Sequence, residues 1–69
     1  MKPFRIYEVV AGGLKKVANY GGGFDNLDRA IKFTDKLKDS SFYWTKVQFA
    51  IMEYSDKYKA KIVKIIEPI

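Results

Sequence analysis

Apolar and polar residues alternate along four stretches of the chain, and between the second and third stretch the apolar residues recur every three to four positions. The alternating stretches run from Phe4 to Val10, Leu14 to Tyr20, Lys46 to Tyr54 and Tyr58 to Ile66. They are rich in β-branched and aromatic residues, which favour strands. Because alternation with period two is typical of a strand with one buried face, we expect four strands.

The stretch between the second and third strands predicts one amphipathic helix. It follows the glycine run GGG, and Asn26 or Asp25 can cap a helix that begins near Leu27 and ends near Lys38 or Asp39. The apolar stripe of this helix comprises Leu27, Ala30, Ile31, Thr34 and Leu37, with Phe33 on its flank. Charged residues occupy the opposite side, so we expect the helix to bury one face.

The predicted order of elements is ββαββ. It indicates an α+β domain in which one amphipathic helix packs on one face of a four-stranded antiparallel sheet. The chain has 69 residues, so residues 1–69 are expected to form a single small domain. A domain of this size buries only about 60% of the surface of its unfolded chain. With no cysteine available for a disulfide, its stability must come from packing or from association.

The turn of the first hairpin decides which of its side chains share a face. A two-residue Gly-Gly turn would pair Val9 with Lys16 and would mix apolar and charged residues on both faces. A three-residue loop at residues 11–13 pairs Val10 with Leu14 instead and collects the apolar residues on one face. We therefore predict the three-residue loop, with a left-handed glycine in its last position.

The second hairpin is predicted with a three-residue loop at residues 55–57. This register places Phe49 opposite Val63 and Ile51 opposite Lys61. The sheet face turned toward the helix is then expected to contain Phe4, Ile6, Val10, Leu14, Ala18, Val47, Phe49, Ile51, Val63 and Ile65. The side chains of the other face point away from the helix.

A single helix covers a single face of the sheet, so the other face is expected to be open. The partner-binding face that we predict comprises Tyr7, Val9, Trp44, Met52, Tyr54, Tyr58 and Ile62. A basic rim around it comprises Arg5, Lys15, Lys46, Lys57, Lys59 and Lys64. Monomers rarely leave a large apolar patch in water. Three explanations are open: contact with a protein or a second copy, binding of single-stranded nucleic acid, or coverage by the segments SSFYW and IIEPI.

The balance of charge favours acidic partners without indicating a specific one. Thirteen Lys and Arg residues against eight Asp and Glu give a formal net charge of +5. This charge attracts polyanions and acidic protein surfaces, although a charge of about 2 to 8 is also ordinary for solubility. Only Arg5 and Arg29 are arginines. This scarcity disfavours sequence-specific readout of nucleic acid, which relies on the arginine fork. Lysines in the fourth strand also protect a sheet edge from pairing with other chains.

No combination of residues indicates catalysis. The chain has neither His nor Cys, and no base accompanies its three serines, so we expect no enzyme, no catalytic residue, no metal and no cofactor. The run GGGFDN lacks both the Lys-Ser/Thr of a phosphate loop and the third glycine of a dinucleotide motif. Asp25 and Asp28 would also repel an anion at the helix start. We expect no small-molecule ligand there.

These observations predict a non-enzymatic binding module that acts through protein contact. Its partner would be a second copy in a homodimer or a larger protein that it inhibits or adapts; the alternative is a nucleic-acid-binding module that uses sheet aromatics and lysines. The ten residues FDNLDRAIKF resemble the strand-to-helix step of small bacterial and phage proteins, which implies an accessory protein. No apolar run approaches the roughly 20 residues that span a bilayer. We expect a cytoplasmic location (the host cytoplasm if viral) and no contact with a membrane.

Overall fold

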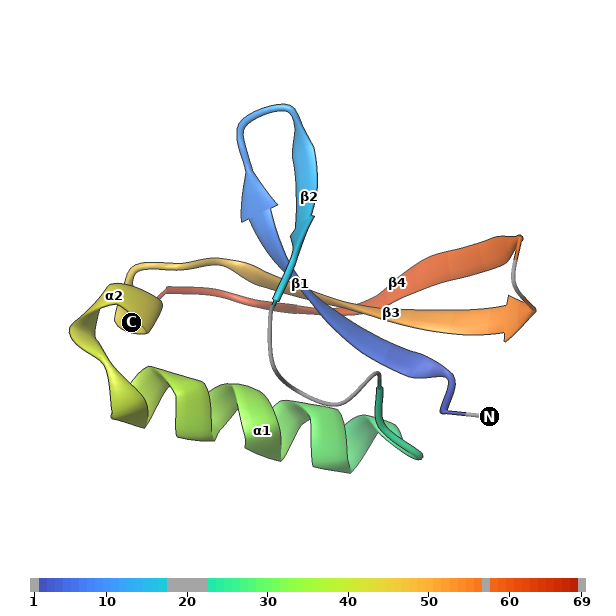
Figure 1. The fold of residues 1–69 in the computed structure, drawn as a ribbon, viewed down its shortest axis with the longest axis horizontal. Coiled ribbons are helices and arrows are strands. Elements are labelled where there is room, and N and C mark those ends of the chain that lie inside the picture. Colours follow the sequence, from blue (N-terminus) through green and yellow to red (C-terminus); the bar gives the residue numbers. More distant parts are fainter. Residues whose placement is uncertain (1, 18–22, 57, 69) are drawn as a thin grey trace.

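A computed structural model of the protein describes residues 2–17, 23–56 and 58–68. Its elements are β1 (Phe4–Val10), β2 (Gly13–Lys16), α1 (Leu27–Ser40), α2 (Phe42–Thr45), β3 (Phe49–Asp56) and β4 (Lys59–Ile66). The strands form one antiparallel sheet in the order β2-β1-β3-β4. Figure 1 shows α1 beneath this sheet, while the β1–β2 hairpin rises steeply from the β3–β4 pair. The predicted α+β fold with the order ββαββ is confirmed.

Helix α1 begins where its capping residue predicts. Asn26 has extended backbone angles, and its Oδ1 accepts a hydrogen bond of 2.9 Å from the backbone N–H of Arg29. This bond satisfies one of the N–H groups that a helix start leaves without an internal partner. Ala30 and Thr34, in the middle of the apolar stripe, are buried against the sheet. The Thr34 hydroxyl donates to the Ala30 carbonyl, so it enters the core with its hydrogen bond made.

The last glycine of the GGG run joins α1 to the sheet; the two glycines before it and residues 18–20 of the predicted second strand lie outside the described residues. Gly23 has φ of +138°, and a Cβ there would lie 3.0 Å from the Lys2 carbonyl oxygen. Phe24, the next residue, exchanges two backbone hydrogen bonds with Phe4. Only glycine combines this backbone angle with so close an approach. Gly23 therefore allows the chain to pass from the sheet to the helix.

The predicted register of the first hairpin is wrong. The chain turns through Ala11 and Gly12, so that Val9 lies opposite Leu14 and Glu8 opposite Lys15. Gly12, with φ of +92°, supplies the left-handed residue of this two-residue turn. A one-residue slip turns every side chain of a strand over. Leu14 consequently lies on the face away from α1, whereas the sequence pattern assigned it to the core.

The predicted register of the second hairpin is also wrong. Phe49 lies opposite Ile66 and Met52 opposite Ile62, while Val63 and Ser55 have no partner in the register because a bulge interrupts each strand. The turn is fixed by Asp56: its Oδ1 accepts hydrogen bonds of 2.7 Å from the backbone N–H of Tyr58 and 3.0 Å from that of Lys59. These two local bonds hold the turn after which β4 begins at Lys59.

The core lies between α1 and the sheet. Its buried members are Ile6, Val17, Ala30, Val47, Phe49 and Ile51, and the side chains packed on them are Phe4, Phe24, Leu27, Ile31, Phe33, Leu37, Trp44, Val63 and Ile66. Trp44 stacks on Phe49 with ring centroids 5.8 Å apart. Of the residues predicted for the core, Val10, Leu14 and Ile65 are exposed instead. Ala18 lies outside the described residues.

Residues of both segments that were candidates to cover the open face pack on the α1 side, while Ile65 is itself part of the open face and residue 69 lies outside the described residues. The connector SSFYW forms α2, which contacts α1 and places Trp44 in the core. At the other end of the chain, Ile66 packs on the core and the Glu67 carbonyl accepts a hydrogen bond of 2.6 Å from Lys38 Nζ of α1. The explanation that these segments cover the open face is therefore wrong for their described residues. In that part of the chain, neither helix has the length and apolarity to cross a membrane.

Candidate interaction surface

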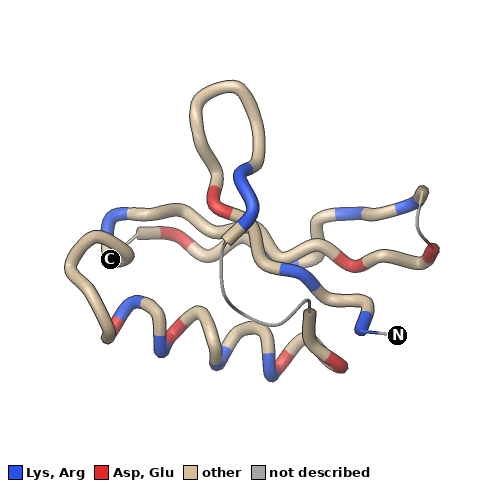
Figure 2. Tube along the Cα trace, viewed as in Figure 1, with Lys and Arg blue, Asp and Glu red and all other residues tan. Residues whose placement is uncertain are grey.

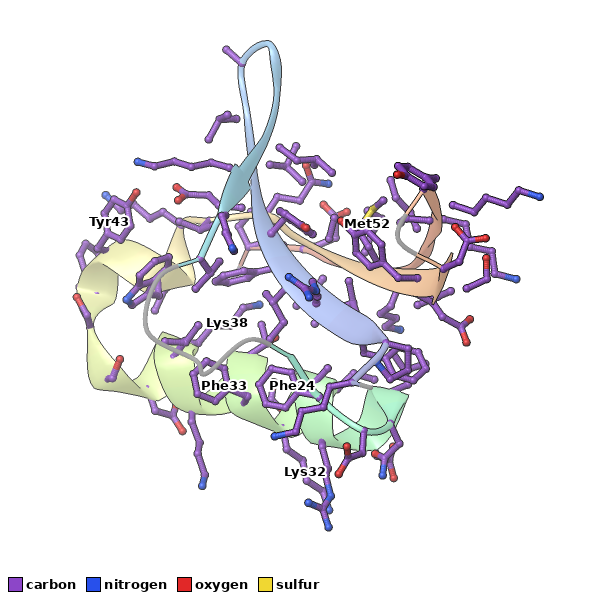
Figure 3. The ribbon with its side chains drawn as sticks, turned by 45° about the vertical axis from the view of Figure 1, so that its right-hand side comes forward. Phe24, Lys32, Phe33, Lys38, Tyr43 and Met52 are labelled. Atoms are coloured by element: carbon purple, nitrogen blue, oxygen red, sulfur yellow. The ribbon has the colours of Figure 1, made fainter. Side chains whose placement is uncertain are left out.

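The sheet has one face that no described helix covers, which we call the open face. The registers place on it Arg5, Tyr7, Val9, Leu14, Lys16, Ala50, Met52, Tyr54, Ala60, Ile62 and Ile65. Figure 1 shows α1 and α2 on the opposite side, and Figure 3 shows Met52 on the side away from α1. Side chains of this face come from all four strands, so the sheet itself fixes their relative positions.

Aliphatic side chains of the open face remain in contact with water. Ile62 is 51% exposed, Leu14 42% and Ile65 38%. Ala50 lies between Tyr7 and Ile65 in the register and is fully buried even though no helix covers it. The larger side chains around Ala50 therefore pack on one another. The open face thus combines one buried small side chain with partly exposed and exposed larger ones.

An aromatic and cationic cluster lies at the β1–β3 pair on this face. The hydroxyls of Tyr7 and Tyr54 are 2.5 Å apart and form a hydrogen bond. The Arg5 guanidinium carbon lies 5.5 Å from the centre of the Tyr54 ring, within the range of a cation–π contact. These contacts join β1 to β3 and hold both rings and the guanidinium in fixed positions on the open face.

The predicted partner-binding residues divide into two groups. Tyr7, Val9, Met52, Tyr54 and Ile62 lie together on the open face, as the registers show. Tyr58, which is 84% exposed, precedes β4 at the turn of the second hairpin. Trp44 is on the other side of the sheet, in the core, because α2 turns its ring onto Phe49. Its assignment to the open face is wrong.

The predicted basic rim is not a continuous feature of the molecule. Arg5 lies within the open face itself. Lys15 and Lys64 belong to the other side of the sheet, where they pair in register with Glu8 and Ile51. Lys46 lies 4.7 Å from the Phe42 ring centre, beside α2. Of the remaining two, Lys59 lies at the start of β4 and Lys57 is outside the described residues. Figure 2 shows basic residues spread over α1 and both hairpins.

Three residues of the open face were missed by the sequence pattern. The two-residue turn brings Leu14 and Lys16 there, and the bulge at Val63 brings Ile65 opposite Ala50. Pairing Val9 with Leu14 matches two apolar residues, and this match was the signal in the sequence for the two-residue turn at Ala11 and Gly12. Nothing in the amino-acid sequence predicts the bulge at Val63.

A second polar contact ties α2 to the sheet. The Tyr43 hydroxyl donates a hydrogen bond of 2.7 Å to Oε2 of Glu8, which is nearly buried on the α1 side. This bond to the carboxylate, more than any other cause, raises the pKa of the Tyr43 phenol above the usual value for tyrosine. The charge of Glu8 acts in the same direction. The contact has a structural role, since neither residue belongs to the open face.

Two shallow hollows are lined by described residues, and the first of them reaches the open face at Ala60. One of about 330 Å³ lies among Glu53, Ser55, Lys59, Ala60 and Lys61. Another of about 420 Å³ lies beside α1 among Phe24, Arg29, Lys32, Phe33 and Lys36. Figure 3 shows Phe24 beside Phe33 and Lys32 extending away from the sheet. The cations of the second hollow belong to the charged side of an amphipathic helix, which is normally solvated. No three His, Cys, Asp or Glu side chains in the described ranges could hold a metal ion together.

Comparison of the chain with protein-family models, with curated proteins and with solved structures gave no match.

Proposed function

We propose that the protein is a non-enzymatic binding module that contacts another protein through its open face. One observation carries this proposal: Trp44 of the connector and Ile66 and Glu67 near the C-terminus pack on the α1 side, so these residues do not cover the open face. Leu14, Ile62 and Ile65 consequently stay in water. Removing such apolar surface from water is favourable, by about 25 cal/mol for each Å².

The open face has the composition and the size that protein interfaces require. Its tyrosines and Met52 are of the types that interface cores favour, and its charged residues are few. A stable interface buries about 800 Å² on each partner. The described chain has an accessible surface of 4754 Å², so such an interface would take roughly one sixth of it. One face of this domain is large enough.

Nucleic acid binding is the alternative, and the geometry supports it less. Arg5 already lies over the Tyr54 ring, so a base would have to compete with this contact. The β4 lysines Lys61 and Lys64 pair in register with Glu53 and Ile51, on the side of the sheet away from the tyrosines. Bases stacked on the open face would therefore not bring their phosphates to these lysines.

Site-specific photocrosslinking in cells tests the proposal. A benzoylphenylalanine at Ile62 reports on the open face, and the same group at Phe42, an exposed apolar residue of α2, is the matched control. We expect protein adducts at position 62 and few at position 42. The second substitution Leu14→Asp should abolish the adducts at position 62, because it places a charge in the interface.

The adducts also separate the possible outcomes. An adduct of the chain with itself at position 62 would identify the partner as a second copy. Equal labelling at positions 62 and 42, together with a strict monomer in sedimentation, contradicts the proposal. Circular dichroism of Leu14→Asp checks that the variant is folded, which we expect because Leu14 lies on an exposed edge strand.

A further inference from the structure

We infer that the partner of the open face presents carboxylates beside apolar side chains, and that Arg5 and Lys16 receive these carboxylates. The inference rests on the proposed function and names the chemistry of the partner. It starts from the charges of the open face: the only charged residues that the described registers place there are Arg5 and Lys16, and both are cations.

The two cations are diagonal neighbours in the register of β1 and β2. Lys16 is directly opposite Tyr7 in the β1–β2 register, and Arg5 is two positions before Tyr7 on β1. Diagonal neighbours on one face of a sheet have backbones about 7–8 Å apart, within the reach of long side chains. Arg5 and Lys16 thus place two positive charges on the same face as the Tyr7–Tyr54 hydrogen bond.

Among the residues that the structure describes, the registers place no Asp or Glu on the face of these two cations. The carboxylates of Glu8 and Glu53 belong to the opposite side of the sheet, where Glu8 accepts its hydrogen bond from Tyr43. Lys16 is exposed, and the Arg5 guanidinium lies over the ring of Tyr54. A partner that covered the face would strip water from both cations, which is costly unless the partner supplies negative charge.

The same charges disfavour two other occupants. A second copy placed face to face would bring Arg5 and Lys16 of both copies together without any carboxylate from the described open face. A nucleic acid would bring phosphates, but aliphatic Leu14, Ile62 and Ile65 offer no surface on which bases stack well. An acidic protein segment with apolar neighbours satisfies both the cations and the aliphatic surface.

Selection from a display library of random peptides tests the inference. The library is panned in parallel on the wild-type protein and on the double variant Arg5→Glu/Lys16→Glu. We expect peptides enriched in Asp and Glu beside apolar residues on the wild type, and in Lys and Arg on the reversed variant. Peptides selected on the wild type should bind the reversed variant at least about tenfold more weakly.

Matched variants make the result specific. The control Lys59→Glu/Lys61→Glu makes the same change in net charge on β4, away from the open face, and should keep affinity within about threefold of the wild type. The single variant Lys16→Glu guards against misfolding, because Lys16 is exposed on the edge strand and Arg5 contacts Tyr54. It should lower affinity in the same direction.

The other outcomes contradict the inference in distinguishable ways. If Ile62→Asp abolishes peptide binding and charge reversal does not, the open face binds proteins but its partner need not be acidic. If neither variant changes binding, the proposed function is wrong as well. Selection of neutral or basic peptides by the wild type, or displacement of the peptides by an oligothymidylate strand that binds more tightly, also overturns the inference.

Discussion

The two faces of the sheet differ in how completely water is removed from them. On the covered face, Ile6, Phe49 and Ile51 are fully buried between the sheet and α1. On the open face, Ile62 is half exposed, and among its described side chains only the small one of Ala50 is fully buried. The covered face therefore holds the fold together. The open face keeps apolar surface whose burial remains available for binding.

The length of α1 explains which part of the covered face remains outside its reach. Its 14 residues span about 21 Å, whereas the longest dimension of the molecule is 34 Å. The helix reaches the middle of the sheet but not the outer ends of the hairpins (Figure 1). Val10, near the tip of the first hairpin on the covered face, is exposed for this reason, whereas Leu14 is exposed because it lies on the open face.

The largest expected contrast comes from truncating one large side chain on each face. Phe49→Ala should cost about 3–5 kcal/mol, because Phe49 is fully buried and its loss leaves a cavity. A domain of this size has a total stability of about 3–10 kcal/mol, so this loss would remove a large part of it. Met52→Ala, on the partly exposed open face, should cost about 1 kcal/mol. Urea unfolding followed by circular dichroism measures both, and equal losses would show that the open face is a second core.

Glycine substitutions compare the segment that leads into α1, at Gly23, with the tip of the first hairpin, at Gly12. Gly23→Ala and Gly12→Ala both force a side chain into positive φ, at a cost of about 1–3 kcal/mol. Gly23→Ala should cost more, because its Cβ would meet the Lys2 carbonyl oxygen at 3.0 Å while the space around Gly12 is empty. Thermal unfolding of the two variants measures the difference. A larger loss at Gly12 would show that the Phe4–Phe24 bridge adds little to stability.

The tyrosine pair measures how much the open face contributes to stability by itself. Tyr54→Phe keeps the ring under Arg5 and removes only the hydroxyl that bonds to Tyr7. We expect a loss of about 0.5–1.5 kcal/mol, the usual net value of one hydrogen bond. Chemical unfolding of Tyr54→Phe, with Tyr58→Phe as a control at the exposed turn, gives the number. A loss of several kcal/mol would mean that this pair is central to the fold.

The smallest expected effect is a pH dependence on the covered side. Because the bond to Glu8 raises the pKa of Tyr43, the folded state holds the phenolic proton more tightly than the unfolded state does. The stability from this bond is present below the usual tyrosine pKa and is lost as pH rises through the raised value. The difference in unfolding free energy between wild type and Tyr43→Phe should therefore shrink at alkaline pH. A difference that is constant across this range contradicts the assignment.

The local elements could be predicted from the sequence because short-range physics determines them. Alternation predicted β1, β3 and β4 to within three residues at either end, and the cap at Asn26 placed the start of α1. The middle of the apolar stripe of α1, at Ala30 and Thr34, also lies against the sheet as expected. Five of the seven residues predicted for the partner-binding face lie on the open face, since alternation alone decides the face of Tyr7 or Met52.

Strand register and the paths of the connecting segments were decided by the tertiary structure. The two-residue turn placed Leu14 and Lys16 on the open face, and the bulge at Val63 placed Ile65 there. One residue more or less in a turn, or an extra residue in a strand, reverses the faces of the residues that follow. The position of Trp44 also depended on the tertiary structure. Its apolar ring fits either face of the sheet, and the path of α2 places it on Phe49. Composition and period are properties of neighbouring residues, whereas register and burial depend on partners that are distant in the chain.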